Sequence, residues 1–516
     1  MCCSLNQASF FVLPNPILCT CDEIMKVKHR EYTINKQLGK IMKTKFSVLI
    51  TGVLVCMPLL GADSRPEALA DPIPEKIQKG SISVTLEEFV RVAETEESAN
   101  PVQTNGAYAR IQYMTPLPDG SGRLAINDLR GLLYLTDETG SEPTVYLDLR
   151  EHDVDFDDST FPNETGLAGV AFHPDFAKQG EPGYGKFYTA YSAPSNSGVA
   201  NYLDDAADNH ESVIREWSAI DSDSNAFSGE SREIFRMGQF DQNHNIGTLA
   251  FNPASDSGEN DYGMLYASFG DGGGANDPRE FGQSTTEPMS SIIRIDPLDS
   301  SDTNAYGIPE DNPFVGQAGF APEIWAYGLR HPQAFSFDED GTMYICDIGQ
   351  TQIEEVNIGQ AGANYGWRVR EGTFATAFGI GGVRPNPVYP KPLDEQEFTY
   401  PVAQFDHDEG NAISSGFVYR GSAIPELYEK FVFTDMVTGR VFYIDTDNLE
   451  PGGSAIITEL RVEFFGQERN VADALGFRNT YSRGNRAGLR LGIDSKGELY
   501  FLTKGDGRVR KMVPKI

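Results

Sequence analysis

The chain has 516 residues and a formal net charge of −33, from 42 Lys and Arg against 75 Asp and Glu. The first 62 residues hold seven of the basic and three of the acidic residues, so the remainder carries 35 against 72. Nucleic acids and anionic membranes are recognised through clustered Lys and Arg, so a surface this acidic excludes both as partners.

Residues 42–62, MKTKFSVLITGVLVCMPLLGA, have the pattern of a secretory signal, with two early lysines, an apolar run and a small-residue exit. The apolar run is short for a membrane span, and no stop-transfer segment follows it. We expect translation to start at Met42 and residues 1–41 not to belong to the mature protein. The mature chain, 63–516, is then secreted or periplasmic and has no membrane insertion.

Cysteine usage fits this processing, because only Cys346 follows the expected cleavage point. A disulfide framework is therefore excluded, although an oxidising compartment would allow one. Stability must come from a large apolar core, which a chain of this length can bury.

The mature chain lacks a sustained helical apolar period and consists of short apolar runs separated by Gly, Asp, Asn and Pro. The runs form six groups, and each group repeats an apolar strand, a polar turn and a strand with an aromatic residue near its start. Groups of short antiparallel strands in succession predict an all-β, six-bladed β-propeller with its long loops around a central channel. The groups span residues 109–137, 166–219, 247–297, 333–359, 414–447 and 488–513.

A single large β-sandwich, or two β domains, is the alternative architecture. The propeller is favoured because the last group runs nearly to the C-terminus and no Pro- or Ser-rich linker divides the chain. Residues 81–89, SISVTLEEF, are expected to supply an outer strand that closes the ring against the last group.

Histidine is the usual general base near neutral pH, and it works best beside an orienting carboxylate. His244 precedes the strand GTLAF and Asp271 follows the strand LYASF, so antiparallel pairing would bring the two together. A histidine that merely caps a turn is the equally open interpretation. By contrast, His210 falls in a polar, acidic stretch and is expected in a loop.

Other polar positions have both a functional and an ordinary interpretation. The stretch EIWAYGLRHPQAF places Arg330 beside His331, which would be an ordinary turn unless the pair faces a channel. Asp406, His407 and Asp408 offer metal ligands or a solvated loop rim. Trp367, in NYGW, is expected to pack within a blade.

The chain resembles the soluble quinoprotein glucose/sorbosone dehydrogenases, a group whose fold is shared by hedgehog-interacting-like proteins. The motifs that carry the resemblance run from about residue 110 to residue 513. They are GLAGVAFHPDF, NHNIGTLAF, LYASFGDGG, IIRIDP, EIWAYGLRHPQAFSFD, CDIGQTQIEEVNIGQAGANYGW and HDEGNAISSGFVYRG. The resemblance implies a six-bladed propeller that oxidises sugars with pyrroloquinoline quinone (PQQ) and calcium.

The resemblance also implies a role for each matching residue. His244 matches the base that removes the anomeric hydroxyl proton, and Asp271 matches its orienting carboxylate. Arg330 matches the arginine that binds the reacting quinone carbonyl, where negative charge develops. The backbone carbonyls of Gly349 and Gln350 match those that bind Ca²⁺.

The sequence departs from the family pattern at several cofactor positions. Glu164 replaces a glutamine, which adds a negative charge near an anionic cofactor, and His331 replaces an asparagine that contacts the quinone. Val437 replaces a cofactor-binding lysine, for which nearby Arg440 is the expected substitute. The family has a pair of cofactor-binding arginines before the last strands, and in this sequence the nearby arginines, Arg483, Arg486 and Arg490, are shifted from those positions. We expect Arg486 to bind the cofactor.

We therefore expect a PQQ-dependent sugar dehydrogenase with a small-molecule sugar substrate and a separate electron acceptor. Two alternatives stay open on the same scaffold: a non-catalytic propeller that binds a partner, and a calcium-dependent lactone hydrolase.

Overall fold

The computed structural model describes nine stretches of the chain, all within the second of its two compact units, Met1–Ser64 and Arg65–Ile516. The expected signal peptide, residues 1–41 and Arg486 therefore lie outside the described residues. The described stretches are 67–96, 107–159, 164–204, 209–301, 304–376, 386–391, 398–464, 466–475 and 488–515.

Four groups of strands each form an antiparallel four-stranded sheet, ordered β2-β3-β4-β5, β6-β7-β8-β9, β10-β11-β12-β13 and β14-β15-β16-β20. The strand bounds are β2 Ile111–Pro116, β3 Arg123–Asp128, β4 Leu132–Asp137, β5 Thr144–Asp148, β6 Leu167–Phe172, β7 Lys186–Pro194, β8 His210–Ala219, β9 Gly229–Gln239, β10 Ile246–Phe251, β11 Leu265–Phe269, β12 Ser291–Ile295, β13 Ile324–Tyr327, β14 Ala334–Phe337, β15 Met343–Asp347, β16 Ile353–Ile358 and β20 Ala403–Asp406. Between β16 and β20 the chain forms a small sheet of β17 Arg370–Glu371, β18 Phe374–Thr376 and β19 Val388–Tyr389.

The remaining strands join in one nine-stranded sheet, ordered β21-β22-β23-β24-β1-β28-β27-β26, with β25 paired to β24. Their bounds are β1 Gln78–Arg91, β21 Ile413–Val418, β22 Lys430–Asp435, β23 Val441–Asp445, β24 Thr458–Phe464, β25 Gln467–Glu468, β26 Leu489–Ile493, β27 Leu499–Thr503 and β28 Arg508–Pro514. Strands from opposite ends of the chain thus share one sheet.

Strand β1 confirms the predicted closing strand and extends beyond residues 81–89. It pairs antiparallel with β28, where Val84 lies opposite Pro514. It also pairs parallel with β24, where Val84 lies opposite Val462. The early strand therefore completes the last group of strands and fastens it to the group before.

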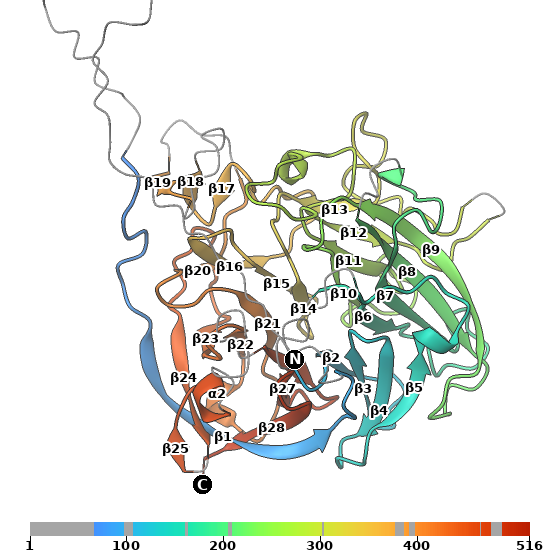
Figure 1. Cartoon of the computed structure of the whole chain (residues 1–516), viewed down its shortest axis with the longest axis horizontal. Helices are drawn as coiled ribbons and strands as arrows, with labels where there is room; N and C mark the ends of the chain where they lie inside the picture. Colours follow the sequence, from blue (N-terminus) through green and yellow to red (C-terminus); the bar gives the residue numbers. More distant parts are fainter. Residues whose placement is uncertain are drawn as a thin grey trace, which may run out of the picture. The chain divides into compact units, whose positions relative to one another are not determined.

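The first strands of successive groups contact one another in cyclic order: β2 with β6, β6 with β10, β10 with β14, β14 with β21, β21 with β26, and β26 with β2. Figure 1 shows β2, β6, β10, β14 and β21 around a common centre, with the later strands of each group farther out. The all-β prediction is confirmed. Cyclic contacts of this kind arise neither in a two-sheet sandwich nor in two separate β domains.

Repeated Asp-x-x-Gly turns set the hairpins of this ring. In the turn after β14, the Gly341 amide donates to the Asp338 carbonyl at 3.0 Å, and in the turn after β26 the Gly497 amide donates to the Asp494 carbonyl at 3.1 Å. Both glycines have positive φ, 85° and 77°, which a side chain would disfavour. The Asp side chain of each turn accepts a local amide, so short sequence signals fix where these strands reverse.

Helical structure is limited to short pieces in the part of the chain that the structure describes. They are α2 (Val471–Ala474), η1 (Leu149–Glu151), η3 (Phe281–Gln283) and η4 (Pro425–Leu427). Among the described residues, helices long and apolar enough to cross a membrane are absent.

The core lies between neighbouring sheets, where aromatic side chains interleave. Trp217 and Phe187 are fully buried, with ring centres 6.1 Å apart, and Tyr146 of the preceding sheet lies 5.5 Å from Phe187. The Trp217 indole donates to the Thr189 hydroxyl at 2.9 Å, so burial leaves its N–H satisfied. Each such side chain contributes about 1.5–3 kcal/mol through burial.

We predict that Val84→Asp lowers the midpoint of urea unfolding strongly. Val84 is fully buried in β1 within an apolar cluster, and burying a carboxylate there is among the most destabilising kinds of substitution. Glu87→Gln is the matched control, because Glu87 is an exposed residue of the same strand. Equal midpoints for the two variants would show that the closing strand adds little to stability.

Candidate active site

The structure brings His244 and Asp271 into direct contact. His244 lies two residues before β10 and Asp271 two residues after β11, and these strands are antiparallel neighbours with Ile246 opposite Phe269. The distance from His244 Nδ1 to Asp271 Oδ1 is 2.5 Å. His244 has a left-handed backbone, φ 55°, which is uncommon for a residue with a side chain and is typical of functional turns.

Asp271 is anchored from several directions. It is fully buried, Trp367 Nε1 donates to its Oδ2 at 2.9 Å, and the Gly273 amide donates to its Oδ1 at 3.0 Å. Burial raises the pKa of Asp271 to about 6, against the lowering effect of Arg330. These donors fix the carboxylate so that it orients the His244 ring.

His244 is held neutral. Burial, and then the charge of Arg330, lowers the pKa of His244 well below its usual value. With Nδ1–H directed at Asp271, Nε2 carries the free lone pair, and Arg330 Nη2 lies 3.3 Å from it. The neutral ring thus presents the Nε2 lone pair, and not a proton, on the side of Arg330.

Arg330 lies in the turn between β13 and β14 and is fixed by carbonyl groups. Its Nη1 donates to the Ile348 and Gly349 carbonyls at 2.9 and 2.7 Å, and its Nε donates to Gln350 Oε1 at 3.2 Å. The guanidinium also lies 5.5 Å from the Trp367 ring centre. None of these contacts of the Arg330 guanidinium is with a carboxylate, so its positive charge beside His244 is not neutralised by them.

His331 stacks on His244, with ring centres 4.6 Å apart and an angle of 18°. It is 4% exposed, yet neither ring nitrogen has a hydrogen-bond partner among the described residues. A side chain at Gly270 would approach its Nδ1 to 2.8 Å, so this glycine leaves room for the stack. Burial lowers the pKa of His331, as do repulsion from a protonated His244 ring and the positive charges of Arg330 and Arg490.

Glu164 adds a negative charge to the same site. Its Oε2 accepts the His244 amide at 2.9 Å and lies 3.6 Å from His331 Nε2. The two departures from the family pattern, Glu164 and His331, are thus spatial neighbours.

The turn that contains Gly349 and Gln350 is held by one buried carboxylate. Glu371 Oε1 accepts the amides of four successive residues, at 2.8–3.1 Å, from Gln350 to Ile353. Beneath it, Asp347 accepts the amides of Arg330 and His331 at 2.9 and 2.7 Å. These carboxylates fix both the carbonyl turn and the Arg-His pair.

A second cationic group lies along the central axis. Arg490 of β26 donates to Gln333 Oε1 at 2.6 Å and lines a narrow axial cavity with His331 and Glu164. Burial, and the positive charges of Arg490 and Arg110, lower the pKa of the buried Lys504 amine well below its usual range. An anion bound here would relieve this repulsion.

Other predicted residues lie elsewhere. Arg440 forms ion pairs with Glu409 and Glu459, at 2.7 and 2.6 Å, next to β23. His407 Nε2 lies 2.8 Å from Glu354 rather than beside Asp406 and Asp408. His210 begins β8 and is fully buried, so its predicted loop position is wrong, because pairing with β7 and β9 extends this strand into the polar stretch.

Three site residues were missed by sequence reasoning. Trp367 is buried, as its predicted packing role requires, and its indole N–H also donates to Asp271, 96 positions away. Glu371 and Lys504 occur in sequence surroundings that resemble any polar turn.

Comparison with known proteins places these residues in a family. The glucose/sorbosone dehydrogenase family matches residues 111–474. HIPL1 protein of Arabidopsis thaliana is 31% identical over 383 residues, which are 64% of this chain and 51% of that protein. Hedgehog-interacting protein of Mus musculus is 25% identical over 324 residues, 61% of this chain and 40% of that protein. The chain thus spans about half the length of these curated relatives.

A solved structure supports the fold. The PQQ-bound aldose sugar dehydrogenase of Streptomyces coelicolor aligns with a TM-score of 0.53 and 19% identity, covering 84% of this chain and 98% of that one. At this identity the likeness concerns the β-propeller fold alone.

We predict that His244 stays neutral, with its proton on Nδ1, from about pH 8 down to about pH 6.5. The reason is its lowered pKa and the contact with Asp271; the first proton enters the pair only near the pKa of Asp271, about 6. Histidine ¹⁵N NMR measures the tautomer, with Asp271→Asn as the comparison. A ring that titrates within this pH range in the unaltered protein would contradict the geometry.

Proposed function

Because the chain belongs to the glucose/sorbosone dehydrogenase family, we propose that it oxidises the anomeric hydroxyl of an aldose, with PQQ as the hydride acceptor and Ca²⁺ as a second cofactor. The observation that carries the proposal is the contact of His244 Nε2 with Arg330 Nη2 at 3.3 Å, opposite the Asp271 contact. A base and an anion-stabilising group thus lie within reach of one small molecule.

We also propose that the propeller has six blades. Four are the separate four-stranded sheets, and the nine-stranded sheet divides into a fifth, β21 to β24, and a sixth, β26 to β28 with β1. The cyclic contacts of the inner strands support this division.

His244 performs the proton transfer in this proposal. Its Nε2 lone pair takes the hydroxyl proton of the sugar, while Asp271 holds Nδ1–H and stabilises the imidazolium that forms. Trp367 and Gly273 keep the carboxylate in place, so the ring does not turn as its charge changes. When bound, PQQ supplies the quinone that accepts the hydride.

The residues at the reacting end fit this cofactor. Arg330 is fixed by carbonyls rather than neutralised, so its charge is available to a quinone oxygen that becomes negative. The unpartnered ring nitrogens of His331 offer a further hydrogen-bond donor at the position where the family has asparagine. Gly349 and Gln350 would bind Ca²⁺ through backbone carbonyls, and the Gly349 carbonyl already faces the Arg330 guanidinium.

The cofactor carboxylates require cations, and Arg490 and Lys504 supply them in our proposal. Both are buried beside the axis, and the repulsion that lowers the pKa of Lys504 would be relieved by an anion. The axial cavity itself has room for about one water molecule. The quinone would therefore bind outside this cavity, and Arg440, engaged by two glutamates, is the weaker candidate.

We also propose that the chain is secreted or periplasmic, and that it uses a small-molecule sugar substrate and a separate electron acceptor. A non-catalytic binding propeller is the second candidate, and the similarity to Hedgehog-interacting protein favours it. The charge of Glu164 beside His244 points the same way, because it opposes binding of an anionic cofactor. Quinone binding separates the two candidates.

We predict that His244→Ala lowers kcat for aldose oxidation by about 10²–10⁴-fold, the usual contribution of a general base, while PQQ is still bound. Dye reduction by a panel of aldoses, with PQQ and Ca²⁺ added, measures the rate. His152→Gln is the control, because His152 packs against Trp217 and Phe227 in an outer layer. Absence of both quinone uptake and turnover in the unaltered protein would favour the binding propeller.

We predict that Lys504→Met weakens PQQ binding by about 10- to 100-fold, since a charge-assisted contact to a carboxylate contributes about 1.5–3 kcal/mol. Equilibrium dialysis measures the affinity directly, without turnover. Lys496→Met is the matched control, because Lys496 is an exposed residue paired with Glu138. Unchanged affinity in Lys504→Met would assign the carboxylate contacts to other cations.

A further inference from the structure

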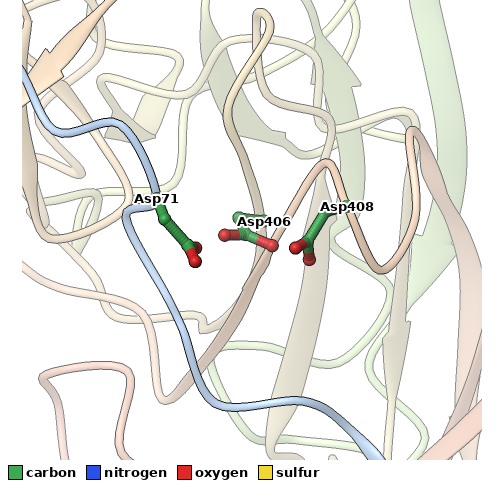
Figure 2. A group of neighbouring side chains, drawn as sticks. All are labelled: Asp71, Asp406 and Asp408. Carbon is green, nitrogen blue, oxygen red and sulfur yellow. The ribbon is translucent and has the colours of Figure 1, made fainter.

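Three aspartates from two distant parts of the chain converge at the outer side of the fourth sheet. Asp71 belongs to the segment that leads into β1, Asp406 is the last residue of β20, and Asp408 follows two positions later. One carboxylate oxygen from each lies within 4.8 Å of the other two. Figure 2 shows the carboxylate of Asp406 between those of Asp71 and Asp408, with one oxygen directed toward each.

Asp406 is the unusual member of this group. It is 4% exposed, and its Oδ2 accepts the Ile73 amide at 3.1 Å. Its Oδ1 is buried and has no hydrogen-bond donor among the described residues. A buried carboxylate oxygen without a donor is costly, so the fold leaves a position beside Asp406 that a positive ligand would stabilise.

The charges of the group do not balance. Among the described residues, the cation that forms an ion pair with these three carboxylates is Lys76, whose amino group pairs with Asp408. Glu409 lies 3.9 Å from Lys76, but its carboxylate already has Arg440 as a partner. The three aspartates and Lys76 together carry a charge of about −2, which one divalent cation would neutralise.

We propose that Asp71, Asp406 and Asp408 bind a calcium ion. Oxygens around Ca²⁺ lie about 2.3–2.6 Å from the ion, so ligands on opposite sides are separated by about 4.6–5.2 Å, and its coordination geometry is more flexible than that of Mg²⁺. The aspartate oxygens already lie within the calcium limit. His407 turns away to Glu354, so the ligand set consists of hard oxygens, which Ca²⁺ prefers over zinc.

The ion would act as a clamp on the strand that closes the ring. Two hydrogen bonds attach the segment before β1 to its neighbours. The Ile73 amide donates to Asp406 of β20, and the Leu69 amide donates to the Val388 carbonyl of β19 at 2.9 Å. A calcium ion between Asp71 and Asp406 would fasten this segment, and β1 after it joins β24 to β28. Calcium would thus stabilise the ring from outside the candidate active site.

We predict that Ca²⁺ at about 100 times its Kd raises the Tm of the chelator-treated full-length protein by about 3 °C and slows proteolytic cleavage within residues 67–77. In Asp406→Asn both effects disappear. The variant without calcium is at least as stable as the unaltered protein, because Asn keeps an oxygen for the Ile73 amide and removes the repulsion. Asp447→Asn, at an exposed position, is the control and keeps the calcium response.

Bound calcium is counted separately by equilibrium dialysis, because a cofactor calcium would also bind at Gly349 and Gln350. We expect Asp71→Asn and Asp406→Asn each to lose one calcium per chain while PQQ affinity stays unchanged. Full calcium occupancy in both variants would overturn the proposal. So would a calcium-dependent rise in Tm that is as large in Asp406→Asn as in the unaltered protein.

Discussion

The pairing of β1 with both β24 and β28 is the constraint on which the rest of the structure depends. Sheets arranged around an axis must close, because an open ring would expose the backbone edge of its last strand. Here residues Gln78–Arg91 supply the missing outer strand, with Val84 opposite Pro514 on one side and Val462 on the other. Closure fixes the distances between the inner strands, and the candidate active site is built on the turns at their ends.

The site combines groups that no single sheet could provide. His244 and Asp271 belong to the third sheet, Arg330 follows it, Trp367 comes from the long insertion after β16, and Glu164 precedes β6. Each is fixed by a buried partner: Asp271 by Trp367, and Arg330 by the carbonyl turn that Glu371 holds. Such preorganisation lets charges act without reorientation during a reaction.

Two departures from the family pattern are neighbours in space. Glu164 and His331 lie 3.6 Å apart, so the added acid and the added imidazole are mutual neighbours. Arg490 and the buried amine of Lys504 lie near the axis, where burial and neighbouring positive charge lower the pKa of Lys504, whereas Arg440 is paired with two glutamates. The scaffold therefore keeps His244 in contact with Asp271, while the charged groups around this pair differ from the family pattern. The proposed calcium clamp belongs to the outer rim and acts on closure of the ring rather than on this chemistry.

The sequence by itself determined the all-β class and the positions of the inner strands of each group, and it offered the contact between His244 and Asp271 as one of two open interpretations. All of these follow from local rules, because side-chain alternation, turn residues and antiparallel neighbours involve short stretches of chain. Only the tertiary structure decided that Trp367 binds Asp271, that Asp71 rather than His407 joins Asp406 and Asp408, and that Lys504 lies near Arg490. These neighbours are set by closure of the ring, which brings together residues up to several hundred positions apart without a local sequence signal.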